Sequence, residues 1–325
     1  MSDARTRLIL DLDTGIDDAL ALAYALGSPE VELVGVVTGY GNVTADVAAR
    51  NTLALLRLLG HPEIPVYRGA DRSLAAGETF VPPEGVRRIH GENGLGDQDF
   101  FSSETLGWCS GALRDGTEFL ARMTEDCPDD GLRYVPTGPL TNLALALGSI
   151  PDLSRTLGRV TFMGGALTVP GNVTPCAEAN VHNDPAAADA VLRGTLKTRM
   201  VGLDVTHQVI LTRDDAAAWR ELGTEAAILF AGMTDHYIEV YEKNNPHMGG
   251  CALHDPLAVA AAIDPTLVSC LPANLRVDLE GPTRGRTVCD PERLRDAQKS
   301  CEVAVGVDAP RFLDEFRRRV ARALS

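Results

Sequence analysis

Short apolar runs alternate with longer amphipathic segments along most of the chain. We predict buried strands from the apolar runs, which span residues 7–11, 31–38, 132–136, 159–163 and 199–203. We predict helices from the segments between and after them, at 19–26, 43–59, 140–147, 186–192, 214–222, 225–243 and 257–262. Strands that alternate with helices are typical of parallel βαβ units. The pattern therefore predicts an α/β fold with an open, mostly parallel central sheet, helices on both of its faces and one domain over residues 1–325.

Two stretches interrupt this alternation. Residues 78–99 are rich in Gly, Pro and charged residues and show no clear periodicity. Residues 244–250, Asn-Asn-Pro-His-Met-Gly-Gly, follow a predicted helix. A loop as long as the first is usually functional or mobile when it belongs to a compact domain. We expect both stretches to be loops, which either cover a ligand site or simply lie on the surface.

A cluster of carboxylates follows the first predicted strand. The sequence Asp11-Leu-Asp-Thr-Gly-Ile-Asp-Asp18 places four acidic residues at a strand-to-helix turn, with Gly15 expected to supply backbone freedom between them. Asp17 and Asp18 could simply cap the following helix and complement its dipole. One carboxylate would be enough for that, whereas four repel one another unless an oxygen-preferring cation such as Ca2+ or Mg2+ binds them. The motif therefore favours a metal site or a site for sugar hydroxyls.

Composition narrows the class of partner. The formal net charge of −15 argues against nucleic acid or an anionic membrane surface, because both bind basic surfaces. No apolar run is long enough to span a membrane, and residues 1–7 lead into the first strand without a signal-peptide core. The seven cysteines form no CxxC pair and no zinc-ligand spacing, which favours reduced thiols in a cytoplasmic protein. We expect a neutral or cationic small-molecule ligand, with no nucleic acid and no membrane as partner.

Polar side chains also follow the later predicted strands. In an open parallel sheet, ligands bind beyond the carboxyl ends of the strands. The residues expected there are acidic, amide, hydroxyl or histidine side chains with almost no Lys or Arg: Asn42, Thr137, Asn172, Glu178, Asn180, His254 and Asp255. Each of them could serve alone as a turn or helix-cap residue. Together they suit a hydroxylated neutral ligand such as a sugar, with a hard cation, and they do not suit a phosphate.

Five segments resemble, in order and spacing, the inosine–uridine-preferring nucleoside hydrolase family. They are Asp11–Asp18, Pro136-Thr-Gly-Pro-Leu-Thr-Asn142, Met163-Gly-Gly165, Gly171-Asn172 with Ala177-Glu-Ala-Asn180, and His254-Asp-Pro256. His90-Gly91 with Gly94-Leu95 resembles the first active-site loop of that family. The resemblance implies hydrolysis of the N-glycosidic bond of ribonucleosides to ribose and free base. It departs from the family at Thr14, where relatives commonly have Pro, and in residues 236–250, which contact the base in relatives.

The resemblance also implies a role for each matched residue. A Ca2+ ion would be held by Asp13, Asp18, Asp255 and the main-chain carbonyl of Thr137. Asp13 would be the general base that deprotonates the attacking water, and His254 would be the proton donor to the leaving base. The residues that would bind the substrate are Asp17, Asn42, Asn180 and Asp255 at the ribose 2′- and 3′-hydroxyls, Asn172 and Glu178 at the 5′-hydroxyl, and His90 in the active-site loop. We expect the chain to act as a homotetramer or homodimer.

The chemistry of such a reaction suits these residue types. Cleavage of a ribosidic bond passes through a positively charged, oxocarbenium-like sugar, which nearby carboxylates stabilise. Two other interpretations remain open. Asp-x-Asp after a first strand also begins the haloacid-dehalogenase-type phosphatases, although those have Thr or Val where this chain has Gly15. A calcium-dependent nucleoside- or sugar-binding protein without catalysis is the other, and release of reducing sugar from inosine or uridine separates all three.

Overall fold

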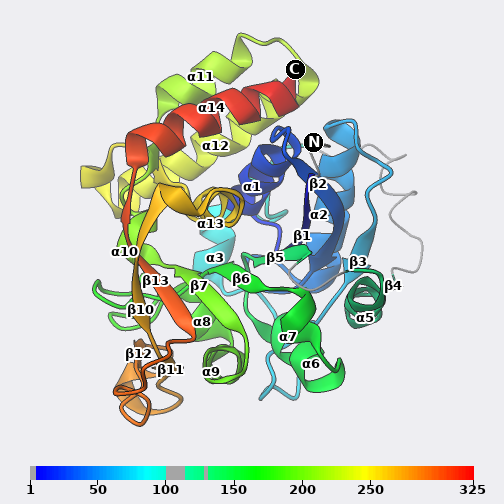
Figure 1. The fold of residues 1–325 in the computed structure, drawn as a ribbon. Coiled ribbons are helices and arrows are strands. Elements are labelled where there is room, and N and C mark those ends of the chain that lie inside the picture. The colour runs from blue at the N-terminus through cyan, green and yellow to red at the C-terminus, as the bar shows by residue number, and fades with distance from the viewer. Residues whose placement is uncertain (1–4, 100–113, 128–130) are drawn as a thin grey trace.

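A mostly parallel sheet forms the centre of the molecule (Figure 1). The computed structural model describes residues 5–99, 114–127 and 131–325. Five parallel strands have the order β4-β3-β2-β1-β5, with the bounds Arg114–Asp115, Val66–Arg68, Val31–Thr38, Thr6–Leu12 and Leu132–Pro136. Four more have the order β10-β13-β7-β6, with the bounds Val268–Ala273, Cys301–Val307, Lys197–Val201 and Arg159–Met163. Only β10 is antiparallel to its neighbour in this second group, and β6 lies beside β5, where the two groups adjoin.

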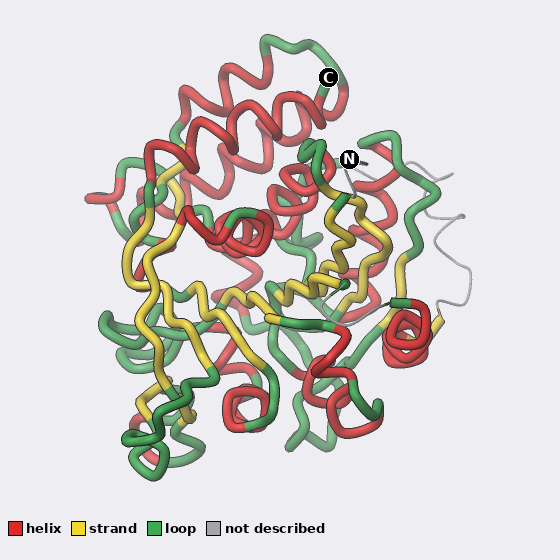
Figure 2. Tube along the Cα trace, viewed as in Figure 1, coloured by secondary structure: helices red, strands yellow, loops and turns green. Residues whose placement is uncertain are grey.

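Helices cover both faces of this sheet (Figure 2). One hydrophobic cluster packs under the longer helices α1 (Ile16–Leu26), α2 (Ala45–Leu58), α12 (Glu225–Asn244), α13 (His254–Ile263) and α14 (Ala309–Leu324). A second cluster packs under α5 (Gly116–Asp126), α6 (Thr141–Ser149) and α9 (Pro185–Arg193). The strand β1 divides the two, because Leu8, Leu10 and Leu12 belong to the first cluster and Ile9 to the second. Alternate residues of a strand point to opposite faces, so a strand buried on both faces is apolar throughout.

The remaining elements are short. The helices are α3 (Glu84–His90), α7 (Leu153–Thr156), α8 (Ala179–Asn183), α10 (Leu203–Thr206) and α11 (Arg213–Arg220), with 3-10 turns at Pro246–Met248, Pro265–Leu267 and Gly281–Thr283. Two antiparallel pairs complete the fold, β8 (Ile210–Leu211) with β9 (Cys251–Ala252) and β11 (Leu275–Val277) with β12 (Thr287–Cys289). Within the described ranges, no helix combines the length and the apolar composition that a membrane crossing requires.

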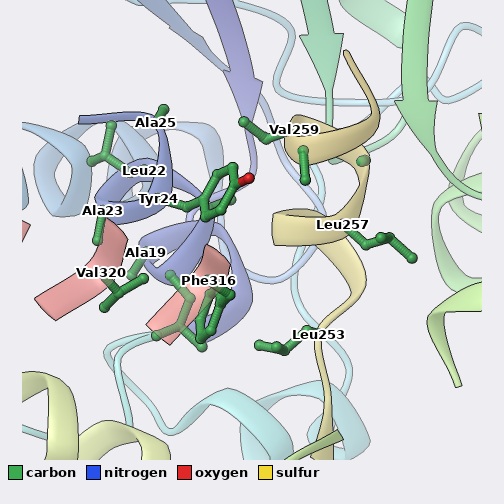
Figure 3. Close-up of a cluster of buried hydrophobic side chains, with 14 of the residues drawn as sticks. Ala19, Leu22, Ala23, Tyr24, Ala25, Leu253, Leu257, Val259, Phe316 and Val320 are labelled. Atoms are coloured by element: carbon green, nitrogen blue, oxygen red, sulfur yellow. The ribbon is translucent and has the colours of Figure 1, made fainter. Parts of the chain in front are cut away.

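Close packing of α1, α13 and α14 fixes where the acidic motif lies (Figure 3). Tyr24 of α1 stacks on Phe316 of α14, with ring centroids 6.2 Å apart and planes 12° apart. Leu257 and Val259 of α13 belong to the same buried cluster as α1. Protein interiors are close-packed, so helices that share one buried cluster can move little relative to one another. The packing therefore holds the first turn of α1, with its aspartates, against the first turn of α13.

The predicted α/β fold is confirmed, and most predicted elements are correct. The strands at 31–38, 132–136 and 159–163 have the predicted bounds, while the strand predicted at 199–203 begins two residues earlier, at Lys197. The prediction of a plain loop over residues 78–99 is wrong for residues 84–90, which form α3. Elements after residue 264 were not predicted. Their strand β10 lies in an antiparallel pair, and several of its side chains are exposed, so the apolar run that marks a buried strand is missing.

Candidate active site

A cavity of about 410 Å³ opens beyond the carboxyl ends of the parallel strands. Its walls contain every candidate residue from the sequence except Asp13 and Asp18: Asp17, Asn42, His90, Thr137, Asn172, Glu178, Asn180, His254 and Asp255. These residues come from the loops after β2, β5 and β6, from the first turns of α1, α8 and α13, and from the end of α3. The lining includes no Lys and no Arg among the described residues. Its size is in the range of small-molecule sites.

Asp13 and Asp18 lie beside this cavity and are held by donors from two other loops. The backbone N–H of Asn42 donates to Asp13 Oδ2 at 2.8 Å, and Asn42 Nδ2 donates to Asp13 Oδ1 and to Asp18 Oδ2, both at 3.1 Å. Thr137 Oγ1 donates to Asp18 Oδ1 at 2.7 Å. The N–H of Gly15 also donates to Asp18, at 2.8 Å. Asp18 therefore caps α1, as the simpler interpretation predicted, while it also takes part in the polar cluster.

Asp17, Asp18 and Asp255 form a group that can hold a metal ion. Each of them offers a carboxylate oxygen, and these oxygens all lie within 4.8 Å of one another. Asp17 Oδ1 and Asp255 Oδ2 are buried and accept no hydrogen bond within the described part of the chain. A buried carboxylate oxygen without a partner is costly, and a hard divalent cation would bind it. This oxygen-only donor set fits Ca2+ or Mg2+.

Burial and mutual repulsion change how these carboxyls titrate. Burial, followed by the charge of Asp18, raises the pKa of Asp17 to about 7. The same two causes raise the pKa of Asp13 well above its usual range, and burial with the charges of Asp17 and Asp18 does so for Asp255. Hydrogen bonding from Asn42 acts in the opposite direction on the pKa of Asp13. A nearby divalent charge favours the ionised forms, so the cluster is suited to bind one.

Asp11, the first acid of the motif, has a different environment from the others. Its carboxylate accepts from Tyr134 Oη at 2.6 Å and from Asn142 Nδ2 at 2.7 Å. It does not line the cavity. Asp11 follows Leu10 along the strand and so shares the face of Ile9. It links β1 to β5 and to the start of α6.

Gly15 is required for space, which corrects the expected role. Its φ of −90° is open to any residue. A Cβ atom at this position would lie 2.6 Å from His90 Nδ1 and 2.7 Å from Asn42 Nδ2. At Gly41, both the backbone conformation and the lack of space require a glycine. Its φ is +156°, and a Cβ there would lie 1.9 Å from Asp13 Oδ2. Both glycines let loops approach the carboxylates closely.

The opposite wall of the cavity comes from the loop between β6 and α8. Glu178 caps α8, because its carboxylate accepts N–H bonds from Gly165, Asn180 and Val181 at 2.9–3.2 Å. Asn180 Nδ2 donates to the main-chain oxygen of Thr137 at 2.6 Å. That oxygen retains a second lone pair. Asn172 Oδ1 accepts from the N–H of Ala179 at 3.0 Å, which fixes the outer part of this loop.

His254 forms a buried chain of hydrogen-bonding groups with two hydroxyls. Its Nε2 lies 2.6 Å from Tyr241 Oη, and its Nδ1 lies 2.8 Å from Thr206 Oγ1. Burial, with the nearby rings of His207 and His90, lowers the pKa of His254 to about 3. The imidazole is therefore neutral near pH 7, with one nitrogen that donates and one that accepts. Tyr241, at one end of this series of hydrogen bonds, lines the cavity.

His90 contributes a second neutral imidazole. Burial lowers its pKa to about 3. The N–H of Ile16 donates to His90 Nδ1 at 3.3 Å, so the ring proton lies on Nε2. The ring of His90 lies 5.6 Å from that of Tyr237, which in turn lies 5.0 Å from the ring of Tyr241. Histidine and tyrosine rings thus form one side of the cavity.

Both stretches that interrupted the sequence pattern contribute to the cavity. The first supplies Val86, Ile89 and His90 from α3, and the second begins with Asn244 and Asn245, at the end of α12. Tyr237 and Tyr241 were not among the predicted site residues, although both lie on the predicted helix at 225–243. Their spacing of four residues places them on the same face of a helix, which is the signal that could have identified them. Thr206 carries no signal in the sequence.

Comparisons with known proteins identify related sequences and structures. The sequence profile of the inosine-uridine preferring nucleoside hydrolases matches residues 8–314. Probable uridine nucleosidase 2 of Arabidopsis thaliana is 37% identical over 94% of this chain and 94% of its own, and pyrimidine-specific ribonucleoside hydrolase RihA of Citrobacter koseri is 33% identical over 97% of each. The solved structure of a purine-preferring ribonucleoside hydrolase from Gardnerella vaginalis is 48% identical and superposes with a TM-score of 0.92 over 98% of this chain and 99% of its own. The chain belongs to the inosine–uridine-preferring nucleoside hydrolase family.

Proposed function

We propose that this chain is a calcium-dependent hydrolase that cleaves ribonucleosides to ribose and free base by direct attack of water, with Asp13 as general base. Ribonucleoside hydrolysis itself follows from membership of the family. The observation that carries the rest is the group of Asp17, Asp18 and Asp255, with two unpartnered oxygens beside a cavity whose described lining has no cationic side chain. A neutral, hydroxyl-rich ligand and a hard cation are what such a surface binds.

The ion would be held by Asp13, Asp18, Asp255 and the main-chain carbonyl of Thr137, with Asp17 beside it. A bound Ca2+ ion would supply positive charge that offsets the repulsion among these carboxylates and makes water easier to deprotonate. The ribose 2′- and 3′-hydroxyls would donate to or accept from Asp17, Asn42, Asn180 and Asp255. Asn172 and Glu178, across the cavity, would bind the 5′-hydroxyl.

Asp13 is suited to take a proton from water. Two N–H groups of Asn42 hold its carboxylate in one orientation, at 2.8 and 3.1 Å. Burial raises its pKa and thus its affinity for a proton, which a general base at neutral pH requires. The water so deprotonated would attack C1′ of the ribose directly. Attack on the face opposite the base implies inversion at C1′, and the ionised carboxylates beside the ring stabilise its developing positive charge.

Departure of the base requires a proton or a hydrogen bond on the far side of the sugar. The family resemblance assigned this role to His254, which lines the cavity beside Tyr241 and is hydrogen-bonded to it and to Thr206. We propose that the Tyr241 hydroxyl donates its proton to the leaving base and that the N–H of the neutral His254 stabilises the resulting tyrosinate oxygen by a hydrogen bond. The proton that Asp13 takes from water returns to Tyr241 when the products leave. His90, whose Nε2 carries a proton, would be a second donor in the same wall.

The test of the proposed function is hydrolysis by metal-depleted and reconstituted protein. Protein dialysed against EDTA is assayed for reducing sugar from inosine and from uridine, before and after addition of Ca2+ or Mg2+. We expect activity to be lost on dialysis and restored by Ca2+, with one ion bound per chain in elemental analysis. Full activity without a bound divalent ion would exclude the metal-dependent mechanism. Absence of ribose release after reconstitution would favour the non-catalytic binding protein.

A further inference from the structure

A second cavity, of about 690 Å³, lies at the amino ends of the parallel strands. Its walls include Thr6 at the start of β1, Arg133 near the start of β5, Arg159 at the start of β6 and Lys197 at the start of β7. These strands are parallel, so their amino ends lie on the edge of the sheet opposite the active site. The cavity is therefore separate from the nucleoside site.

The charge of this cavity is opposite to that of the protein. Five of its lining residues are cationic, namely Arg133, Arg155, Arg159, Lys197 and Arg199, and none of the described lining residues is acidic. The whole chain has 45 acidic residues and only 30 Lys and Arg. A concave wall that collects cations in so acidic a chain focuses a positive field.

Two of these cations are held in fixed positions. Arg199 donates to Glu302 Oε2 through Nε at 3.1 Å and Nη2 at 2.6 Å, and its Nη1 donates to the main-chain oxygen of Ala261 at 3.0 Å. Arg159 Nη2 lies 3.1 Å from Glu302 Oε1. The single negative charge of Glu302 is thus shared by the guanidinium groups of Arg199 and Arg159, which leaves a net positive charge. Lys197 is exposed and makes no ion pair or side-chain hydrogen bond in the described part of the chain.

We propose that this cavity binds the phosphate group of a small anionic molecule. Guanidinium and ammonium groups are the usual ligands of phosphate, and several held close together bind it more strongly than one. Ser154 and Thr195 line the same wall and can add neutral hydroxyl donors. The volume is sufficient for a ligand of the size of a mononucleotide as well as for free phosphate.

Helix α13 connects the two sites. It begins with His254 and Asp255 in the active-site wall, and its last turn, with Ala262 and Ile263, lines the cationic cavity. At about 1.5 Å per residue, these two ends are roughly 13 Å apart. On the proposed function, the acidic end binds a neutral sugar, whereas the cationic end binds an anion. A phosphorylated molecule that is a poor ligand for the first can therefore bind at the second.

The test compares two charge-reversed variants by calorimetry on the calcium-loaded protein. Lys197→Glu removes an exposed cation from the cavity, and Arg322→Glu makes the same change in net charge on α14, outside the cavity lining. Inorganic phosphate and uridine 5′-monophosphate are titrated at constant ionic strength set with NaCl, and hydrolysis of inosine and of uridine is followed separately as release of reducing sugar. We expect both phosphates to bind the wild-type protein in the millimolar range or tighter. Lys197→Glu should weaken both at least tenfold, and Arg322→Glu should change neither more than about twofold.

Each outcome of these titrations supports or overturns the phosphate site. Tighter binding of the nucleotide than of phosphate identifies the ligand as a phosphate ester, and equal binding identifies it as free phosphate. Phosphate binding that Lys197→Glu leaves unchanged would place the anion elsewhere and overturn the proposal. No heat of binding from either phosphate at concentrations well above the millimolar range would also overturn it. Hydrolysis of inosine and of uridine should proceed at the same rates in both variants, which shows that each is folded, and absence of both activities in the wild-type protein would contradict the proposed function instead.

Discussion

Substitution of Tyr241 by Phe tests the proposed route of the proton to the leaving base. The change removes one oxygen and keeps the ring that lies 5.0 Å from Tyr237. The lost hydroxyl is the partner of His254 Nε2 at 2.6 Å. His254 is 4% exposed, so water does not easily replace this partner. The variant therefore interrupts the chain of hydrogen bonds without opening a large cavity.

The expected size of the effect follows from two terms. Leaving a buried donor or acceptor without a partner costs about 1–3 kcal/mol, which sets the loss of stability. A positioned general acid contributes about 10²–10⁴-fold to the rate when the leaving group needs it. We therefore expect kcat for inosine to fall about 100-fold or more in Tyr241→Phe. We expect the thermal midpoint to fall only by a few degrees, because about 1 kcal/mol moves it by about 2–4 °C in a chain of about 150–250 residues and by less in a longer one.

The assay uses two substrates that differ in their need for an acid. Hypoxanthine is a poor leaving group, whereas p-nitrophenolate leaves with little help. Tyr241→Phe and His254→Ala should both lower turnover of inosine far more than turnover of p-nitrophenyl riboside. The double variant should be no slower than the slower single variant, because both changes interrupt the same chain.

The control makes the same chemical change at another buried tyrosine. Tyr24→Phe removes a hydroxyl from the core cluster of α1 and α14, outside the cavity lining. It should leave both activities within about twofold of wild type. Equal losses on inosine and p-nitrophenyl riboside in Tyr241→Phe would refute the role in leaving-group departure and favour a purely structural role for Tyr241 and His254.

Three further predictions concern the acidic cluster. Asp13→Asn should lower kcat by about 10²–10⁴-fold at saturating calcium. The same change at the exposed Asp214 should leave kcat unaltered. If Asp13→Asn lowers kcat only a few-fold, another group is the base. Burial raises the pKa of Asp17 to about 7, so between pH 8 and pH 6 a proton on this carboxyl competes with the ion. The Kd for Ca2+, measured by calorimetry, should therefore rise at least about tenfold from pH 8 to pH 6. A Kd that stays constant would contradict this. Loss of the ribose 2′-hydroxyl removes hydrogen bonds to charged groups worth about 1.5–3 kcal/mol each, so kcat/KM for 2′-deoxyinosine should be about 10²-fold or more below that for inosine, and a ratio near one would exclude the proposed ribose contacts.

The active-site edge of the sheet could be predicted from the sequence because one geometric rule governs it. Strands buried on both faces read as apolar runs, and parallel strands bring their carboxyl ends together. The polar residues after residues 31–38 and 132–136, such as Asn42 and Thr137, therefore had to meet Asp13 and Asp18. Their hydrogen bonds to one another, at 2.7–3.1 Å, agree with this expectation. The prediction needed no knowledge of side-chain conformation.

Other features depend on tertiary packing that no local pattern encodes. Asp11 belongs to the same motif as Asp13 but is bound by Tyr134 and Asn142, outside the cavity. Thr206 reaches His254 from an element 48 residues earlier in the chain. Strand β10 follows no simple apolar run, because several of its side chains are exposed. These contacts depend on how the helices and the sheet edges pack against one another. Residues far apart in the sequence determine that packing, so no short segment predicts it.

The same geometric rule extends to the amino ends of the strands, where it explains the distribution of charge. Arg133, Arg159 and Lys197 stand at or near the first residues of their strands, just as Asp13 and Thr137 follow the last residues of theirs. In this part of the sheet, cations therefore lie at the amino ends of the strands, and carboxylates follow the carboxyl end of β1. A 5′-phosphate in the active site would lie near Glu178 and the aspartates, with no Lys or Arg in the described lining to bind it. On the proposed function, we therefore expect the acidic edge to favour neutral nucleosides over nucleotides by repulsion, a form of specificity that contacts to the base alone would not give.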